Sequence, residues 1–292
     1  MDKSAGYIAV DWGTTNRRGY RLDAAHNLQS HFEDHRGITT MSDGDFSGEV
    51  QEIRLRLGDL PVLLAGTVGS SRGWHQTGYI ELPAGPTALA AGLLWLDPGR
   101  TAIIPGVSQR DPRADVMRSE ELQAIGAALI GLAPDPGLSC HPGTHAKWIR
   151  LSGGMIRSFR TTMTGELFAL LRSHTILAEH LRGEVTDGPA FRFGVQAALA
   201  GAEPLTELFG YRARALLDAQ REHAASHASG LLIGADIRAG LSDGAESRVT
   251  VVGRTDLGLL YAAGLEEAGI TATLVDGAEA FLAGVKALVD LL

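Results

Sequence analysis

Two stretches of the chain, set 130 residues apart, each join a short apolar strand to a glycine-threonine turn. The first reads IAVDWGTTN (residues 8–16) and the second LSCHPGTH (residues 138–145). With the strand that follows, each makes a hairpin whose tip offers backbone N–H groups and hydroxyls to an anion. The likeness predicts an internal duplication with one phosphate-binding turn in each half of the chain. The alternative is a chance similarity between two β-hairpins.

Asp11 ends the first apolar strand and has the chemistry of a metal ligand. A carboxylate at this point can hold Mg²⁺ directly or through water, because that ion favours hard oxygen ligands. The competing interpretation is structural, since aspartate and glycine are also common turn formers. The shift that sets Gly143-Thr144 over Gly13-Thr14 also sets Lys147 over Arg17.

A second candidate site loop covers residues 66–74 and follows a predicted buried strand at 62–65. Ligands of α/β sheets bind beyond the carboxyl ends of the strands, which is where this loop begins. The loop contains two hydroxyls, a guanidinium and an aromatic face, a combination that suits a polyhydroxylated anion. These side chains are Ser70, Ser71, Arg72 and Trp74. An ordinary surface loop is the alternative.

Two adjacent carboxylates, Glu120 and Glu121, stand near the start of a helix expected at 117–132. Acidic residues are favourable near the positive end of a helix for structural reasons alone. Neighbouring helical residues point about 100° apart, so at most one of the two can face a cleft squarely.

Composition sets the broad class. The 292 residues exceed what one compact core usually spans, which predicts two domains. A net charge of −8 without a Lys/Arg run argues against a nucleic-acid partner. The single cysteine, Cys140, allows no internal disulfide. The N-terminal stretch lacks the apolar segment of a signal peptide and no long apolar run predicts a membrane span, so we expect a cytoplasmic protein.

Apolar strands alternate with helical patterns along the chain, which predicts an α/β fold. The polar, Gly- and Pro-punctuated stretch at 106–116 is the candidate link, giving domains at 1–110 and 111–292. The pattern predicts helices at 43–57, 86–96 and 166–181 and a strand-to-helix turn at 231–236. It also predicts a C-terminal helix at 278–291, and the sequence leaves open whether this helix packs on the first domain. The strand at 248–253 ends in Gly253. This glycine could form the bottom of an adenine pocket, because it allows close approach of the backbone, or it could belong to an ordinary βα turn.

Seven segments together resemble the 2-dehydro-3-deoxygalactonokinase family. They are DWGTTNRRGYRL (11–22), AGTVGSSRGW (65–74), VMRSEELQAIGA (116–127), PGTHAKWIRL (142–151), RTTMTGELFALLRSHTIL (160–177), LLIGADI (231–237) and AEAFLAGV (278–285). That family belongs to the superfamily of sugar kinases, actin and heat-shock ATPases. The resemblance implies a two-lobed actin-like ATPase fold of duplicated ribonuclease-H-like domains with an interdomain cleft. It also implies ATP-dependent phosphorylation of the C6 hydroxyl of 2-dehydro-3-deoxy-D-galactonate, in galactonate breakdown.

The resemblance also implies roles for particular residues. In this picture Asp11 organises Mg²⁺, and positive charge near the phosphates comes from Lys147 and Arg17. The β- and γ-phosphates of ATP are held by two turns, formed by Gly13, Thr14, Thr15 and Asn16 and by Gly143, Thr144 and His145. The second turn has His141 where the first has Asp11, so we expect one metal-organising carboxylate from the hairpins.

A catalytic base and a substrate pocket complete the implied site. Related sugar kinases carry an aspartate where this chain has glutamates, so Glu120 is the first choice for the base and Glu121 the second. The carboxylate of the sugar acid needs a cation, which Arg72 or Arg118 could supply. Thr164 and Glu166 are expected to touch the sugar or a phosphate.

Three alternatives remain open from sequence. The chain could phosphorylate another sugar or sugar acid on the same fold, because pocket shape decides that choice. It could instead be a non-kinase nucleotide-binding switch or scaffold of the actin type, or hydrolyse phosphate esters or polyphosphate. The expected partner is a small sugar acid, with no nucleic acid and no membrane, and the sequence leaves open whether the chain forms a homodimer.

Overall fold

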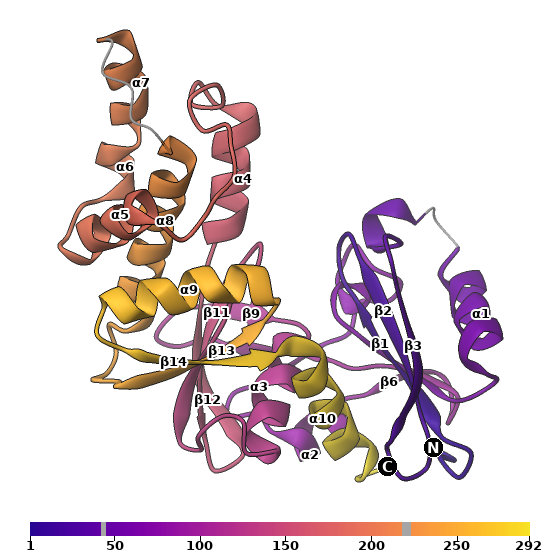
Figure 1. Ribbon diagram of the computed structural model, residues 1–292. Coiled ribbons are helices and arrows are strands. Elements are labelled where there is room, and N and C mark those ends of the chain that lie inside the picture. The colour runs from indigo at the N-terminus through magenta and orange to yellow at the C-terminus, as the bar shows by residue number, and fades with distance from the viewer. Residues whose placement is uncertain (42–44, 218–222) are drawn as a thin grey trace. The chain divides into compact units, whose positions relative to one another are not determined.

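The computed structural model describes residues 1–41, 45–217 and 223–292 (Figure 1). The chain divides into two compact units. Unit 1 comprises residues 1–130, 153–158 and 279–292, and unit 2 comprises residues 131–152 and 159–278. The division into domains at 110/111 stays a prediction. Within the described residues no helix combines the length and apolar character needed to cross a lipid bilayer.

Unit 1 is built on a six-stranded sheet with the order β3-β2-β1-β4-β7-β6. Its strands are β1 (Tyr7–Trp12), β2 (Arg17–Leu22), β3 (Leu28–Asp34), β4 (Val62–Ala65), β6 (Leu94–Asp97) and β7 (Thr101–Ile103). β1 runs antiparallel to β2 and parallel to β4. β1 and β4 are central and almost wholly buried, which explains their continuous apolar runs.

Helix α1 (Phe46–Leu57) places Phe46, Val50 and Ile53 in a core with Trp12. The helix predicted at 43–57 is thus confirmed from residue 46, while residues 43 and 44 lie outside the described residues. The prediction at 86–96 is wrong in its second half. Helix α2 (Pro86–Ala91) ends before Gly92, and Leu94 and Trp95 pair with β7 because the chain turns back there to form the edge strand β6.

Residues 106–116, expected as a link, instead form most of two strands in unit 1. They belong to a small sheet with the order β5-β8-β9, made of β5 (Tyr79–Glu81), β8 (Gly106–Gln109) and β9 (Asp115–Met117). β9 leads directly into α3 (Glu120–Leu129). Against α3 packs α10 (Gly277–Val289), where a Cβ on Gly126 would stand 1.9 Å from the carbonyl oxygen of Ala280. Only glycine allows this close approach of two helices.

Unit 2 has a five-stranded sheet with the order β12-β11-β10-β13-β14. Its strands are β10 (Gly137–His141), β11 (Ala146–Ser152), β12 (Met155–Thr162), β13 (Arg248–Gly253) and β14 (Thr271–Asp276), and the first residues of β12 group with unit 1. β10 runs antiparallel to β11 and parallel to β13. This repeats the arrangement of β3-β2-β1-β4-β7, so the predicted duplication is confirmed at the level of topology.

The helices of unit 2 are α4 (Thr164–His174), α5 (Pro189–Leu199), α6 (Pro204–Glu207), α7 (Phe209–Leu216), α8 (Ala224–Gly240) and α9 (Thr255–Glu267). The predicted strand-to-helix turn at 231–236 is wrong, because these residues lie inside α8. Most of α8 is buried, so it has no polar stripe from which a helical period could be read. Its glycines allow close packing: a Cβ on Gly230 would stand 2.0 Å from the carbonyl oxygen of Phe191 in α5.

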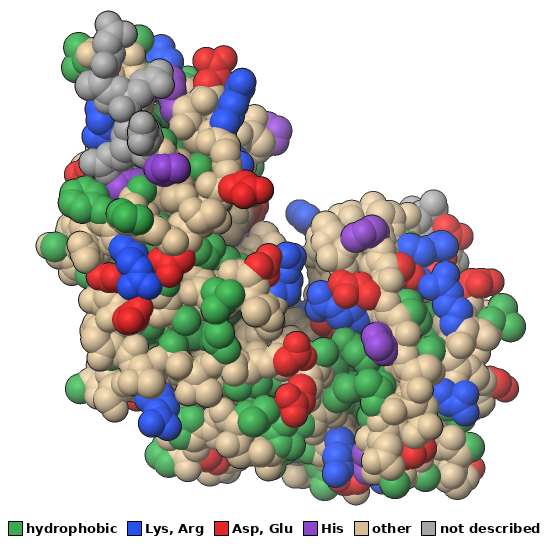
Figure 2. Space-filling view, in the orientation of Figure 1, with side chains coloured by type: hydrophobic (Ala, Val, Ile, Leu, Met, Phe, Trp, Pro, Cys, Tyr) green, Lys and Arg blue, Asp and Glu red, His purple; other side chains and the backbone are tan. Residues whose placement is uncertain are grey.

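Acidic and basic side chains are interspersed on the face drawn in Figure 2, without a single basic patch on that face. The sequence carries 34 acidic and 26 basic side chains, so negative charge is in excess. An anionic ligand must therefore be held by local groups.

Candidate active site

Asp11 lies at the carboxyl end of β1 with its side chain 19% exposed. Its Oδ1 accepts a hydrogen bond of 2.8 Å from the hydroxyl of Ser119, and its Oδ2 lies 3.9 Å from Nη1 of Arg18. Burial raises the pKa of the Asp11 carboxyl, while the Ser119 hydrogen bond and the Arg18 charge oppose that rise. A metal ion at Oδ2 would stabilise the negative charge of this largely buried carboxylate.

The first turn is held in shape by a backbone hydrogen bond within it and by a side-chain hydrogen bond from the following loop. The N–H of Gly13 donates to the carbonyl of Asn16 at 2.9 Å, and the hydroxyl of Thr39 donates to the carbonyl of Thr14 at 2.8 Å. Thr14 and Thr15 are exposed, and Oγ1 of Thr14 lies 3.4 Å from Oγ1 of Thr67. The turn is therefore a fixed loop with its hydroxyls at the surface.

Arg17 does not lie beside the turn as expected. It is 1% exposed, and its guanidinium donates to Glu49 and Asp34 at 2.8 Å each while lying 5.0 Å from the Trp12 ring centroid. This corrects the expectation that Arg17 brings charge to a phosphate, because the carboxylates of the core already hold its donors. The neighbouring Arg18 is the cation that faces Asp11.

The start of α3 reaches Asp11 through Ser119. Ser119 precedes the helix with φ +89° and ψ −38°, and its N–H donates to Oε1 of Glu121 at 3.0 Å. Glu121 is 1% exposed, and burial together with the charge of Glu120 raises the pKa of its carboxyl to about 8. Glu120 is partly exposed. The two glutamates thus differ in access to solvent.

The loop after β4 joins this group through Gly66, whose φ is +93°. A Cβ there would stand 2.8 Å from the carbonyl oxygen of Trp12, so glycine is needed for the approach. Ser71 and Arg72 are exposed, and the hydroxyl of Ser70 accepts from the N–H of Arg72 at 3.2 Å. Within this loop Gly66 lies beside Asp11, where a Cβ would stand 3.4 Å from Oδ1, and Thr67 lies beside Thr14.

Trp74 and Arg118, two members of the predicted substrate group, are partly buried. The Trp74 ring stacks on Phe46 at 6.1 Å between centroids and so belongs in part to the core. Arg118 donates to the carbonyl of Thr77 at 3.0 Å and lies 4.1 Å from the centroid of the Tyr79 ring. Its guanidinium is therefore fixed in direction, whereas Arg72 is exposed.

In unit 2 the second turn is packed against the start of α4. A Cβ on Gly165 would stand 2.3 Å from the carbonyl oxygen of Gly143. The N–H of Glu166 donates to the carbonyl of Thr144 at 2.9 Å, and Nε2 of His145 lies 2.5 Å from Oε2 of Glu166. The structure thus brings together two groups of residues that the sequence singled out separately.

Gly253 lies at the end of β13 with φ +149°, and a Cβ there would stand 3.7 Å from the carbonyl oxygen of Pro142. It is the last residue of a largely buried strand, and Gly66 directly follows a buried strand in unit 1. The positive φ at both junctions is the backbone conformation that glycine adopts without strain.

His141 and Lys147 face each other across the second hairpin and are both buried. Burial and the Lys147 charge lower the pKa of His141 to about 3, so its imidazole is neutral at physiological pH. The second hairpin thus carries a neutral side chain at the position of Asp11.

Asp236 in α8 is a buried carboxylate that the sequence analysis did not single out. Its oxygens accept hydrogen bonds from Trp148, Thr162, Thr164 and Tyr261. Four donors from four elements make Asp236 a structural anchor. Through Thr164 it fixes the first residue of α4, next to the second turn.

Ser119, Arg18 and Thr67 are the other residues close to the site that sequence reasoning missed. Serine before an acidic helical turn indicates an ordinary N-cap, so nothing in its type pointed to Asp11. Arg18 could have been found from the hairpin itself, because it stands directly across from Asp11.

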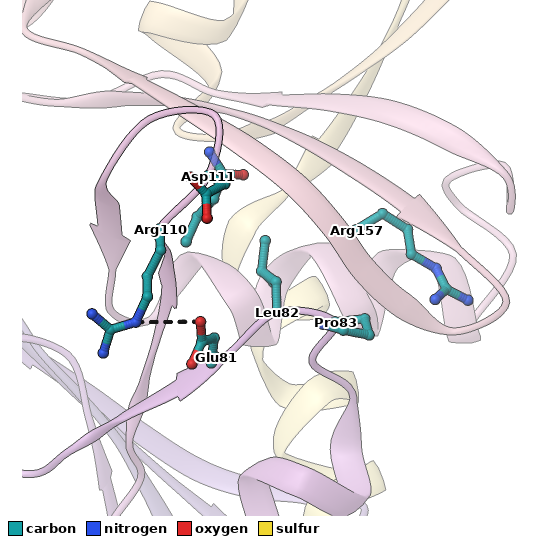
Figure 3. A pocket seen from close by; sticks show the side chains of 7 residues that line it. Glu81, Leu82, Pro83, Arg110, Asp111 and Arg157 are labelled. Atoms are coloured by element: carbon teal, nitrogen blue, oxygen red, sulfur yellow. Dashed lines mark ion pairs between the residues drawn. The ribbon is translucent and has the colours of Figure 1, made fainter.

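A separate pocket of about 260 Å³ lies in unit 1 and includes none of the predicted site residues (Figure 3). It is lined by Glu81, Leu82, Pro83, Gln109, Arg110, Asp111 and Arg157. Nε of Arg110 lies 3.3 Å from Oε1 of Glu81, and in Figure 3 Arg157 points away from this pair. Because the paired side chains are largely exposed, we assign no role to the pocket.

The sequence profile of the 2-keto-3-deoxy-galactonokinase family matches residues 11–288. The 2-dehydro-3-deoxygalactonokinase of Escherichia coli (strain K12) is 35% identical over 291 residues, which cover 98% of each chain. The crystal structure of a Sinorhizobium meliloti protein assigned as a 2-dehydro-3-deoxygalactonokinase superimposes with a TM-score of 0.89 at 34% identity, covering 97% of each chain.

A more distant structure has a similar fold. The activator of 2-hydroxyisocaproyl-CoA dehydratase from Clostridium difficile, solved with bound ADPNP, superimposes with a TM-score of 0.54 at 12% identity, covering 98% of this chain and 95% of that one. Together with the duplicated sheets, these structures confirm the predicted actin-like ATPase fold. On the match over nearly its whole length, the chain belongs to the 2-keto-3-deoxy-galactonokinase family.

Proposed function

We propose that this protein transfers the γ-phosphoryl group of ATP to the C6 hydroxyl of 2-dehydro-3-deoxy-D-galactonate. The observation that carries the proposal is the match to 2-dehydro-3-deoxygalactonokinases over nearly the whole chain, which spans Asp11, both turns and the start of α3. Phosphoryl transfer depends mainly on positioning and on stabilising charge, and these residues are suited to both tasks.

Asp11 fits a site for Mg²⁺. Its Oδ1 accepts a hydrogen bond from Ser119, and its Oδ2 lies 3.9 Å from Nη1 of Arg18. Mg²⁺ is usually held by one or two carboxylates together with waters and substrate phosphates, so one hard oxygen from the protein is enough. When bound, Mg²⁺ neutralises charge on the phosphates.

The two turns are proposed to bind the β- and γ-phosphates. In the first, Gly13 and Asn16 close the loop while Thr14 and Thr15 present hydroxyls. In the second, Gly143, Thr144 and His145 are braced by α4. Arg18 and Lys147 are the cations across from the strand end in each hairpin. Gly253 is proposed to allow close approach of the adenine.

Glu120 is proposed as the general base. The C6 oxygen attacks the γ-phosphorus as its proton passes to the Glu120 carboxylate, and the bond from the γ-phosphorus to the β,γ-bridging oxygen breaks to release ADP. Glu121 is unsuited to this step, because it is 1% exposed and holds its own proton up to a pKa of about 8. Greater access therefore favours Glu120.

Arg118 is proposed to bind the carboxylate of the sugar acid. The contacts with Thr77 and Tyr79 fix its guanidinium, so less rotamer entropy is lost on binding. Ser70, Ser71 and Arg72 are proposed to bind sugar hydroxyls, with Trp74 behind them. Thr164 and Glu166 remain proposed contacts of the sugar or a phosphate.

The proposal is tested with purified protein, ATP, Mg²⁺ and a panel of hydroxylated acceptors, measuring ADP release and the site of phosphorylation. We expect kcat/KM to be highest for 2-dehydro-3-deoxy-D-galactonate, with phosphate on C6. A preference for a neutral hexose would overturn the substrate assignment. Phosphate release that does not depend on an acceptor would overturn the kinase assignment.

A further inference from the structure

Ser119 has a backbone conformation that its side chain does not favour. Its φ of +89° lies in the region that glycine adopts without strain, and among the described residues only His26 and His223 share a positive φ without being glycine. Strained residues of this kind persist where the surrounding structure fixes them, and they concentrate at functional sites. The serine at this position is therefore a candidate for a functional role.

The hydroxyl does not cap the helix that it precedes. A serine before a helix usually accepts a hydrogen bond from an N–H of the first turn, but Ser119 forms no such bond. Its Oγ donates instead to Oδ1 of Asp11, 108 residues away in sequence, at 2.8 Å. Its N–H donates to Oε1 of Glu121 at 3.0 Å. One residue thus joins the end of β1 to the start of α3.

This arrangement leaves the two oxygens of Asp11 in different states. Oδ1 is occupied by Ser119, which fixes the rotation of the carboxylate, and Oδ2 remains as the oxygen for another ligand. Ser119 is 8% exposed, so its hydroxyl is held in place by its surroundings. A preset carboxylate orders a bound metal ion better than one that must be fixed on binding.

We propose that Ser119 is a positioning residue that orients the Asp11 carboxylate for Mg²⁺ and connects it to the helix carrying Glu120. The inference rests on the proposed kinase function, because it assumes that Asp11 binds the metal. It assigns to the Ser119 hydroxyl a role in metal affinity and none in contacts with the sugar acid.

Two substitutions separate this role from a purely structural one. Ser119→Gly removes both the hydroxyl and the backbone strain, whereas Ser119→Ala removes the hydroxyl and keeps the strain. We therefore expect the glycine variant to melt at a higher temperature than the alanine variant. If the hydroxyl positions Asp11, both should need about tenfold more Mg²⁺ for half-maximal activity, with little change in KM for the sugar acid.

A binding measurement without turnover supplements the kinetics. Mg²⁺ is titrated against each protein in the presence of a non-hydrolysable ATP analogue, and the thermal shift is recorded. Both variants should require about tenfold more Mg²⁺ than wild type for half of the maximal shift. His223→Gly relieves a positive φ at an exposed position in unit 2 and should leave the Mg²⁺ response unchanged.

The outcomes are distinct. If the Mg²⁺ requirement follows melting temperature, so that the glycine variant behaves like wild type, Ser119 has only a structural role and the inference fails. An unchanged requirement in both variants also overturns it. If wild-type protein phosphorylates no sugar acid but still shows a Mg²⁺-dependent shift that both variants weaken, the proposed function fails while the role of Ser119 stands.

Discussion

Nη1 of Arg18 lies 3.9 Å from Oδ2 of Asp11, directly across the first hairpin. In the second hairpin Lys147 lies across from His141 in the same way. A cation thus pairs with Asp11 in the first hairpin and with His141 in the second, but only the first of these two positions carries a carboxylate. At these paired positions a basic residue is present in both units, whereas the carboxylate is present only in unit 1, as Asp11.

Asp11→Asn should retain the fold and remove most turnover. The amide oxygen can still accept from Ser119, but the neutral group cannot supply the negative charge that Mg²⁺ prefers. We expect kcat to fall by about 10²–10³-fold, with a melting temperature equal to or above that of wild type because a buried charge is removed. Steady-state kinetics and a thermal melt check both points.

Glu33→Gln is the matched control for Asp11→Asn. Glu33 is an exposed carboxylate that pairs with the same Arg18 at 3.0 Å. Its loss should change kcat less than about twofold. Near-normal turnover of Asp11→Asn would remove Asp11 from the metal site.

Arg18→Gln and Arg17→Gln should give opposite phenotypes. Arg18 is partly exposed, so its loss should change the free energy of unfolding by no more than about 1 kcal/mol while raising the KM for ATP several-fold. Arg17→Gln leaves the carboxylates of Glu49 and Asp34 without their buried partner and should destabilise the protein by about 3–5 kcal/mol.

The measurements for this pair are urea unfolding and the ATP dependence of the rate. The assignment of Arg17 to the core would be contradicted if its variant unfolded like wild type and had a raised KM for ATP. The assignment of Arg18 to the site would be contradicted by an unchanged KM.

Glu120→Gln should lower kcat by about 10²–10⁴-fold with little change in the KM for the sugar acid, because the variant binds substrate but cannot accept its proton. Glu121→Gln should keep most of the activity, since that carboxyl is already protonated at neutral pH. The comparison is made at pH 7 under saturating ATP. The reverse pattern would transfer the role of base to Glu121.

The raised pKa of Glu121 predicts a pH dependence of stability. The folded protein binds this proton with a pKa of about 8, compared with an ordinary value of 4.5. The protonated Glu121 carboxyl therefore contributes fully to stability below the ordinary pKa, and this contribution is lost as pH rises through the folded pKa. The total loss is about 1.4 kcal/mol for each pH unit between the ordinary and the folded pKa. Glu121→Gln cannot ionise and should become progressively more stable than wild type between about pH 5 and 8.

Urea unfolding of wild type and Glu121→Gln across this range measures the difference. The pKa of His141 is shifted in the opposite direction from that of Glu121, because burial and the charge of Lys147 lower it to about 3. Its contribution is present above pH 6.5 and is lost as pH falls, so it affects both proteins equally. Parallel curves from pH 5 to 8 would show that Glu121 is ionised in the folded state.

Gly165→Ala should damage the second turn. Its Cβ would stand 2.3 Å from the carbonyl oxygen of Gly143, and both partners are backbone, so one of them must move. We expect a loss of about 1–3 kcal/mol in stability and a several-fold rise in the KM for ATP. Gly48→Ala in α1 is the control, since nothing lies within 4 Å of its Cβ, and it should stabilise the helix by up to about 1 kcal/mol. An unchanged KM for ATP in Gly165→Ala would argue against the turn as a phosphate site.

The sequence by itself determined the features that depend on local patterns. Apolar strands ending in Gly-Thr turns 130 residues apart were enough to predict the duplicated hairpins, and the sheet topology agrees. The position of Asp11 at a strand end and of Glu120 at a helix start also follows from local pattern. These features can be predicted from sequence because a strand or a helix start is specified by a few consecutive residues.

Only the tertiary structure decided which neighbours those residues have. Residues 231–236 look like a buried strand, but they lie in α8, because a helix buried on most sides loses its polar stripe. When the two hairpins are aligned by a constant shift of 130 residues, Lys147 corresponds to Arg17. Cross-strand pairing makes Lys147 correspond to Arg18 instead, because Asp11 pairs with Arg18 and His141 pairs with Lys147. One residue in a strand reverses the face of a side chain, so Arg17 enters the core and Arg18 faces Asp11. The positive φ of Ser119 and its bond to Asp11 arise from contact between segments 108 residues apart, which no local pattern encodes.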